Sequence, residues 1–160
     1  MRKHGLVAIA VVGASVVAAP AASAQLGLPL DATYTDHFVG NNGTPGCPGD
    51  AYECGSGTAA GLGPFTDTVV FNNGTPTVTR TMVFADGSTL VLVETFVNFT
   101  PTSNAPPNSK GVLNSFGHPG NLLLGWSASG TGDFTGADGT GTDDQNQAGD
   151  QAKGFIGGTI

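Results

Sequence analysis

A β-hairpin in the middle of the chain is the sequence feature that most restricts its possible folds. Residues 77–84 lead into Asp86-Gly87, and residues 89–99 return, with β-branched and aromatic side chains on both sides of the turn. An Asp-Gly pair between such runs is a strong hairpin signal, because glycine accepts the positive φ that a tight turn requires. The returning run 90–93 (Leu-Val-Leu-Val) is apolar on both faces, which indicates a strand covered on both sides or lining a filled barrel.

The rest of the chain also has the composition of strands and turns. It contains 26 glycines, far above the usual share of about 7%, and Glu53 and Glu94 are its only glutamates. We predict further strands at 32–39, 65–71, 122–129 and 154–160. Residues 101–109 are predicted as an exposed loop, and the polar, glycine-rich residues 136–151 as an irregular excursion. Short strands separated by turn signals predict an all-β sandwich or barrel.

The N-terminus has the pattern of a secretory signal peptide. Arg2 and Lys3 precede a largely apolar run at 6–19, and Ala22-Ser23-Ala24 offers the small residues that signal peptidase accepts. The run is shorter than the roughly 20 apolar residues of a membrane span. We therefore predict a signal at 1–24, a single mature domain at 25–160, and a secreted, extracellular protein without a membrane anchor after cleavage.

The charge of the chain excludes one class of partner. The formal net charge is −7, and removal of Arg2 and Lys3 makes the mature chain more acidic still. Binding to nucleic acid or to an anionic membrane requires clustered Lys and Arg, which are absent from this sequence. No nucleic-acid partner is expected, and the acidity favours solubility outside the cell.

Cys47 and Cys54 are the only cysteines. An even number in an oxidising compartment predicts a disulfide across this short loop. A metal site is the alternative, but no histidines stand near these thiols to complete four ligands.

Residues 130–139 (Gly-Thr-Gly-Asp-Phe-Thr-Gly-Ala-Asp-Gly) resemble a motif of the allene oxide cyclase and dirigent barrel superfamily. Members often carry Gly-Thr-Gly, an aromatic residue and Gly-Ala-x-Gly between late strands, and residues 61–65 are similar to a glycine-rich turn of that group. The resemblance implies an antiparallel, eight-stranded β-barrel with a central cavity. Plant members cyclise an allene oxide or steer radical coupling, whereas many bacterial relatives have no assigned activity. No catalytic residue of those enzymes matches a position in this chain.

Arg80 and Glu94 are the candidate ligand-binding residues, because each is a lone charge in its strand of the central hairpin. A three-residue loop with a bulge would place them opposite one another, whereas a two- or four-residue loop would put them on opposite faces. If both point inward, they form a buried ion pair able to orient a polar group on a ligand. If both point outward, they form a cross-strand salt bridge of a few tenths of a kcal/mol.

The remaining polar residues do not form a recognisable reactive site. Several aspartates crowd residues 133–150, but the EF-hand-like start at Asp144 lacks a ligand at Ala148 and a distal glutamate, so no metal is expected. His37 and His118 are interpreted as surface or structural residues. No acid–base arrangement favours an enzyme, and no cofactor is implied.

Two functions of different classes follow from these observations. The first is non-catalytic binding of a small apolar molecule or a protein partner. The second is an isomerase or cyclase that uses the same barrel cavity. A barrel of this size can hold one small ligand, which suits both functions.

Overall fold

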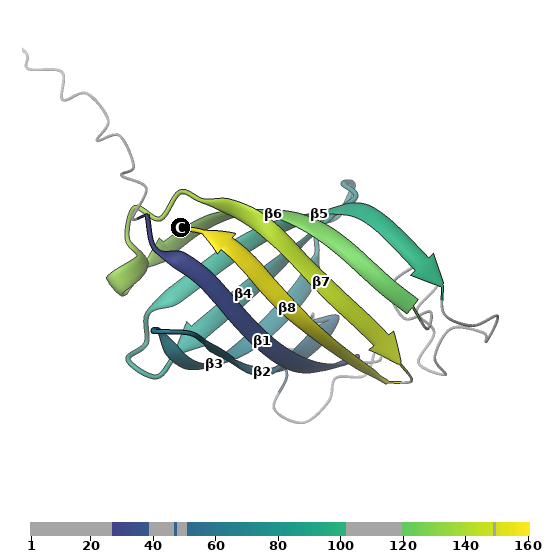
Figure 1. The fold of residues 1–160 in the computed structure, drawn as a ribbon, viewed down its shortest axis with the longest axis horizontal. Coiled ribbons are helices and arrows are strands. Elements are labelled where there is room, and N and C mark those ends of the chain that lie inside the picture. Colours follow the sequence, from purple (N-terminus) through teal and green to yellow (C-terminus); the bar gives the residue numbers. More distant parts are fainter. Residues whose placement is uncertain (1–26, 39–46, 48–50, 102–119, 149) are drawn as a thin grey trace, which may run out of the picture.

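The protein forms a closed, eight-stranded antiparallel β-barrel in a computed structural model, which describes residues 27–38, 47, 51–101, 120–148 and 150–160 (Figure 1). Each strand pairs with its neighbours in sequence, and pairing of the first strand with the last closes the barrel. The elements are β1 (Pro29–Phe38), β2 (Glu53–Ala59), β3 (Gly63–Phe71), β4 (Thr77–Phe84), β5 (Thr89–Pro101), β6 (Gly120–Thr131), the short 3₁₀ helix η1 (Gly132–Phe134), β7 (Thr140–Ala148) and β8 (Gln151–Thr159).

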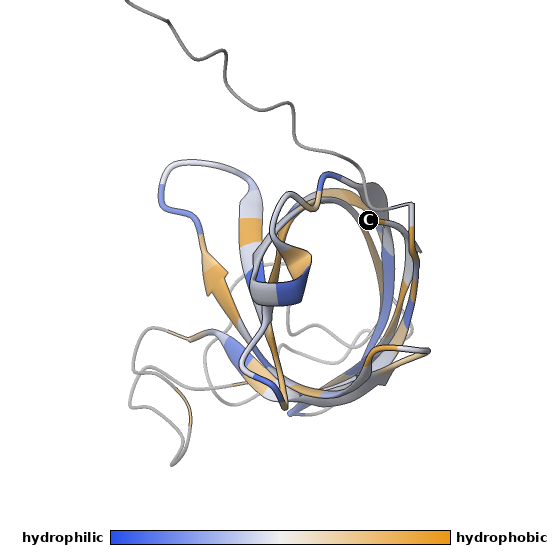
Figure 2. Cartoon of the chain, turned by 90° about the vertical axis from the view of Figure 1, so that its left-hand side faces the viewer, coloured by the Kyte–Doolittle hydropathy of each residue, from blue (hydrophilic) through white to orange (hydrophobic). Residues whose placement is uncertain are grey.

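Closure removes the exposed sheet edges that an open antiparallel sheet would leave. Figure 2, a view along the barrel, shows the strands as a ring, with η1 over the near end. We call this end the mouth; it is bordered by the β2–β3 and β4–β5 turns and by η1. Ile160 exchanges two backbone hydrogen bonds with Leu28 at the same end, so the C-terminal residue is fixed beside the start of β1.

The all-β barrel and its central hairpin confirm the sequence prediction. β4 has the predicted bounds, and Gly87 has φ +86° in the β4–β5 turn. The strands expected at 32–39, 65–71, 122–129 and 154–160 correspond to β1, β3, β6 and β8, with shifted ends.

The prediction for residues 136–151 was wrong. Thr140–Ala148 is the full barrel strand β7, paired with β6 and β8. Asp143, Gln145 and Gln147 point into the barrel and are buried, while Thr142, Asp144 and Asn146 are exposed. The strand has a regular alternation, but both faces are polar, so hydropathy alone could not reveal it. β2 was also missed, because its inner positions 55 and 57 are glycines.

The interior is layered along the barrel axis. The half next to the mouth is a continuous apolar core from every strand except β7, including Leu30, Phe65, Met82, Trp126 and Ile156. Beyond it lies a layer of charged and polar inward side chains, and at the far end the buried side chains are again apolar, with Phe38, Val78 and Leu122. Along β4 the inward order from the mouth is Phe84, Met82, Arg80, and Arg80 is fully buried.

Several strand glycines make room for large aromatic side chains inside the barrel. A Cβ at Gly154 would overlap the ring and hydroxyl of Tyr34, and a Cβ at Gly57 would overlap the ring of Phe65. Gly141 and Gly158 provide the same space for Trp126. The glycine content therefore reflects packing within strands as well as turns, an effect that the interpretation as turn residues did not include.

Cys47 and Cys54 form the expected disulfide, with their Cα atoms 6.0 Å apart. It ties residue 47 to the start of β2. The predicted signal at 1–24, residues 102–109 of the predicted loop, and His118 lie outside the described residues.

Candidate functional site: a buried arginine cluster and a mouth pocket

The register of the central hairpin places Arg80 and Glu94 on the same inner face. Phe84 N–H donates to Ser88 O around the turn, and in the ladder Arg80 pairs with Leu92 while Val78 pairs with Glu94. Arg80 and Glu94 are therefore diagonal neighbours on one face. Neither arrangement expected from the sequence, directly opposite or on opposite faces, is formed. Both are fully buried, so the pair faces the barrel interior and the outward salt bridge is not formed.

Arg80 is surrounded by carboxylates from five other strands, an arrangement that we call the Arg80 cluster. Nε donates to Glu94 Oε1 at 3.0 Å, and Nη1 donates to Asp36 Oδ2 at 2.7 Å and to Asp67 Oδ2. Nη2 lies 3.3 Å from Asp143 Oδ2. The guanidinium also stacks over the Tyr34 ring, with Cζ 4.1 Å from the ring centroid. Glu53 completes the set, with Oε2 4.0 Å from Nη2.

One guanidinium cannot neutralise this many buried carboxylates, so some of them retain protons near neutral pH. Burial raises the pKa of Asp36 to about 7 and that of Asp143 to about 8, although Arg80 opposes both shifts. Burial likewise raises the pKa of Glu94, and it raises that of Glu53 well above its ordinary value. Isolated charges are too costly to bury, and neutralisation is the usual response.

Hydrogen bonds extend the cluster along β7. The Tyr34 hydroxyl donates to the Asp143 carboxylate at 2.8 Å, and Gln145 Nε2 donates to the Tyr34 hydroxyl and to Glu53 Oε2, each at 3.1 Å. Gln147 Nε2 donates in turn to Gln145 Oε1 at 2.6 Å. Among the described residues, Asp36 Oδ1, Asp67 Oδ1 and Glu94 Oε2 are buried without a hydrogen-bond partner. The cluster thus holds acidic groups able to donate protons, and lone pairs left for a further donor.

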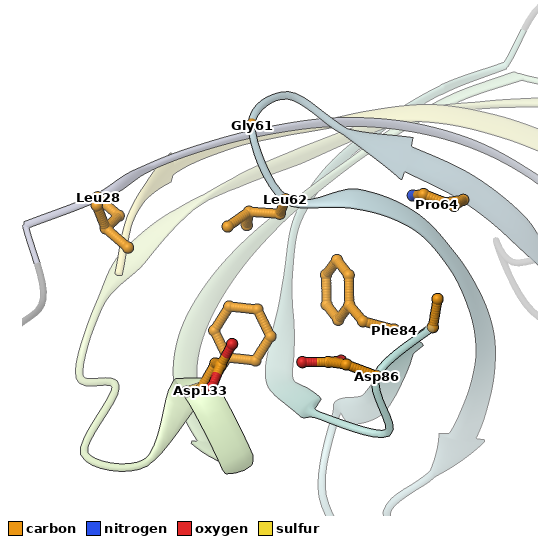
Figure 3. A pocket seen from close by; sticks show the side chains of 9 residues that line it. Leu28, Gly61, Leu62, Pro64, Phe84, Asp86 and Asp133 are labelled. Atoms are coloured by element: carbon orange, nitrogen blue, oxygen red, sulfur yellow. The ribbon is translucent and has the colours of Figure 1, made fainter.

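A second feature is an open pocket at the mouth, of about 430 Å³, a volume within the range of small-molecule sites. Figure 3 shows its labelled side chains. Phe84 and Phe134, with ring centroids 4.9 Å apart, form its apolar floor. The remaining lining residues are Leu28, Gly61, Leu62, Pro64, Ala85, Asp86 and Asp133. This mouth pocket is apolar at its base and carries two carboxylates at its rim.

Ser88 holds the two sides of the rim together. Its Oγ donates to Asp86 Oδ2 at 2.7 Å and accepts from the Asp133 backbone N–H at 3.1 Å. A Cβ at Gly132 would crowd Ser88, and Gly132 has φ +62°, so glycine suits this position on both counts. The η1 segment is therefore fixed against the β4–β5 turn, and the mouth pocket is preformed.

The acidic residues considered for calcium do not converge. Asp143 points into the barrel, whereas Asp144 is exposed on its outer face, because neighbours in a strand alternate. Within the described ranges, no group of His, Cys, Asp or Glu has the arrangement of a metal site. His37 is exposed at the end of β1, as the surface interpretation predicts. In the same ranges, no helix has the length and hydropathy of a membrane span.

No protein-family model matches this chain, and no curated protein or solved structure is significantly similar to it. The eight-stranded antiparallel barrel is therefore the level at which the protein is classified.

Sequence reasoning identified Arg80 and Glu94 but missed the other members of the cluster. These members come from strands that are far apart in the sequence, and closure of the barrel brings them together: Asp36, Asp67 and Asp143. For Asp36 and Asp67 alternation was the available signal, because each stands in phase with apolar residues, Tyr34 and Phe38 around Asp36 and Phe65 and Val69 around Asp67. Asp143 stands in a strand that is polar on both faces and gave no such signal. The mouth pocket was missed because it combines side chains from three turns.

Proposed function

We propose that this protein is a secreted, non-catalytic binding protein that holds a small apolar molecule in the mouth pocket. The observation that carries the proposal is the preformed cavity of about 430 Å³ with Phe84 and Phe134 at its base. Concave sites with aromatic lining and a few fixed polar groups are where small ligands usually bind. Secretion rests on the N-terminal pattern at residues 1–24.

The resemblance to the allene oxide cyclase and dirigent superfamily is part of the same proposal. Residues 130–139, which carry the resemblance, include η1 and supply Asp133 and Phe134 to the pocket. The second stretch, residues 61–65, supplies Gly61, Leu62 and Pro64. Both segments that resemble the superfamily therefore contribute to the proposed binding site.

An uncharged apolar probe tests this proposal directly. Ala85 is exposed and lines the pocket, so an Ala85→Trp side chain should fill the space without disturbing the core. Naphthylmethanol should bind saturably to the mature wild-type chain. It should bind at least about 10-fold more weakly to the Ala85→Trp variant. Ala148→Trp, an exposed alanine at the end of β7, is the matched control and should bind as wild type. Equal binding by all three proteins would contradict the proposal.

A second candidate function is an isomerase or cyclase that works in the barrel interior. It is favoured by buried carboxyls with a raised pKa beside the Tyr34 hydroxyl, since groups that titrate near neutral pH suit general acid catalysis. Arg80 and Glu94 would orient the substrate in that case. On the mouth side the apolar core covers these groups, so the open pocket takes precedence.

Native mass spectrometry of the protein purified from its culture medium separates the two functions. Non-catalytic binding predicts one retained molecule that is released chemically unchanged. Catalysis predicts that the retained material, or a substrate added to the protein, is converted to isomers.

A further inference from the structure

The rim of the mouth pocket distinguishes one class of ligand from others. Its lining includes two carboxylates and no Lys or Arg, and the two acids come from separate segments, the β4–β5 turn and η1. Figure 3 shows the Asp86 and Asp133 side chains on the same side of the opening, next to the aromatic floor. A molecule with its apolar part on Phe84 and Phe134 can therefore place a polar end near both acids.

The Asp86 carboxylate and the backbone of Asp133 are held in place before a ligand arrives. Ser88 Oγ donates to Asp86 Oδ2, and the Ser88 backbone N–H donates to Asp86 Oδ1 at 3.0 Å. These hydrogen bonds from Ser88 lower the pKa of Asp86, and the neighbouring Asp133 side chain adds to the lowering. Asp86 is therefore ionised at neutral pH. Because the Asp133 backbone N–H donates to the same Ser88 Oγ, one side chain joins the Asp86 carboxylate to the segment that carries Asp133.

Two negative charges beside an apolar cavity favour a cation and disfavour an anion. Among the described residues the Lys and Arg side chains are Arg80 and Lys153, and neither lines the pocket. Arg80 is paired with carboxylates inside the barrel, and Lys153 is exposed on β8. A protonated amine can donate to both carboxylates, and such charge-assisted hydrogen bonds are stronger than neutral ones. An acidic ligand of the same shape would meet repulsion from both.

We infer that the ligand of the mouth pocket is an amphipathic amine, with an apolar body against Phe84 and Phe134 and a protonated nitrogen between Asp86 and Asp133. This inference rests on the proposed binding function and specifies its ligand class. Neutral apolar molecules enter the same space with lower affinity.

The test uses three probes that share one ring system: naphthylmethylamine, naphthylmethanol and naphthoate. Binding is measured by calorimetry on the mature full-length chain at neutral pH and low ionic strength. The amine should bind about 3- to 10-fold more tightly than the alcohol, and naphthoate should bind most weakly. Salt should reduce the preference for the amine, because exposed charges are screened.

Variants at the rim connect this preference to named residues. Asp133→Asn should weaken amine binding about 2- to 5-fold and leave alcohol binding unchanged. Asp86→Asn is the second variant, in case the first affects folding, and Asp144→Asn, an exposed acid on the outer face of β7, is the control.

The outcomes separate the two levels of the proposal. Equal affinity for amine and alcohol, or an amine affinity that neither rim variant changes, would overturn the inference while binding itself stands. Failure of the amine and the alcohol alike to bind would overturn the proposed function.

Discussion

Arg80 and Glu94 contact each other across a diagonal inside the barrel, with Arg80 Nε 3.0 Å from Glu94 Oε1. In the strand ladder each stands opposite an apolar residue, Leu92 and Val78 respectively. The diagonal leaves the rest of the guanidinium free to reach Asp36, Asp67 and Asp143 on other strands. With Glu53 on β2, Arg80 thus links six of the eight strands through charge, which makes it central to closure of the barrel.

Replacement of Arg80 should strongly destabilise the barrel. Arg80→Met removes the only cation of the cluster and leaves its carboxylates unpaired, a change that usually costs about 3–5 kcal/mol. Glu94→Gln is the matched variant, because glutamine keeps an oxygen that can accept from Arg80 Nε, and it should cost less than about 1 kcal/mol. Urea unfolding at pH 7 measures both. Similar losses for the two variants would show that the arginine has no special role.

Stability should fall as the pH rises from about 4 to about 8. Asp36 and Asp143 have a pKa near 3.8 when unfolded, and about 7 and about 8 when folded. Between these values the folded state binds more protons than the unfolded state, so rising pH favours unfolding by up to about 1.4 kcal/mol per pH unit for each proton. The stability that comes from these bound protons is fully present below about pH 4. It is lost as the pH rises through the pKa values of Asp36 and Asp143 in the folded state.

Asp143→Asn provides the check on this pH dependence. It should flatten the slope between pH 6 and pH 8 in urea unfolding, because one of the cluster's titrating carboxyls is gone. Asp144→Asn alters an exposed neighbour on the opposite face and should leave the slope unchanged. A wild-type stability that rises across this pH range would refute the assignment of protons to the cluster.

Two strand glycines should respond very differently to alanine. At Gly154 a Cβ would overlap Tyr34, so Gly154→Ala should lower stability by about 1–3 kcal/mol. At Gly125 the nearest atom to a Cβ is Val97 Cγ2 at 3.6 Å, an ordinary contact, so Gly125→Ala should be tolerated. Thermal unfolding of the two variants measures the contrast. Equal melting temperatures would mean that Tyr34 does not depend on the glycine for its space.

Local turn chemistry was readable from the sequence, whereas contacts that depend on barrel closure were not. The hairpin around Asp86-Gly87 was predictable because turn chemistry and β-branched flanks agree. β7 was not, because a strand whose inner residues are Asp143, Gln145 and Gln147 has no hydropathy contrast. The inward Arg80–Glu94 pair was one of two open alternatives, but its diagonal register was not among the predicted arrangements, since a single sequence does not fix the turn. Their acidic partners depend on barrel closure, which no local pattern encodes.

The last strand should be required for folding. β8 pairs with both β1 and β7, and Ile156 and Ile160 are fully buried in the core near the mouth. Deletion of residues 154–160 opens the barrel and exposes two strand edges, so the truncated chain should not fold. Far-UV circular dichroism with a thermal scan gives the answer. A truncated chain that is soluble and melts cooperatively would disprove this role for β8.

The most direct measurement of the central claim is the location of a bound probe, read from leucine methyl NMR spectra of the mature chain during titration with naphthylmethylamine. Leu28 and Leu62 line the mouth pocket, whereas Leu92 and Leu124 are buried deeper in the barrel. We expect saturable shifts at Leu28 and Leu62, with Leu92 and Leu124 unchanged. Shifts confined to Leu92 and Leu124 would contradict a mouth site and place the ligand in the interior.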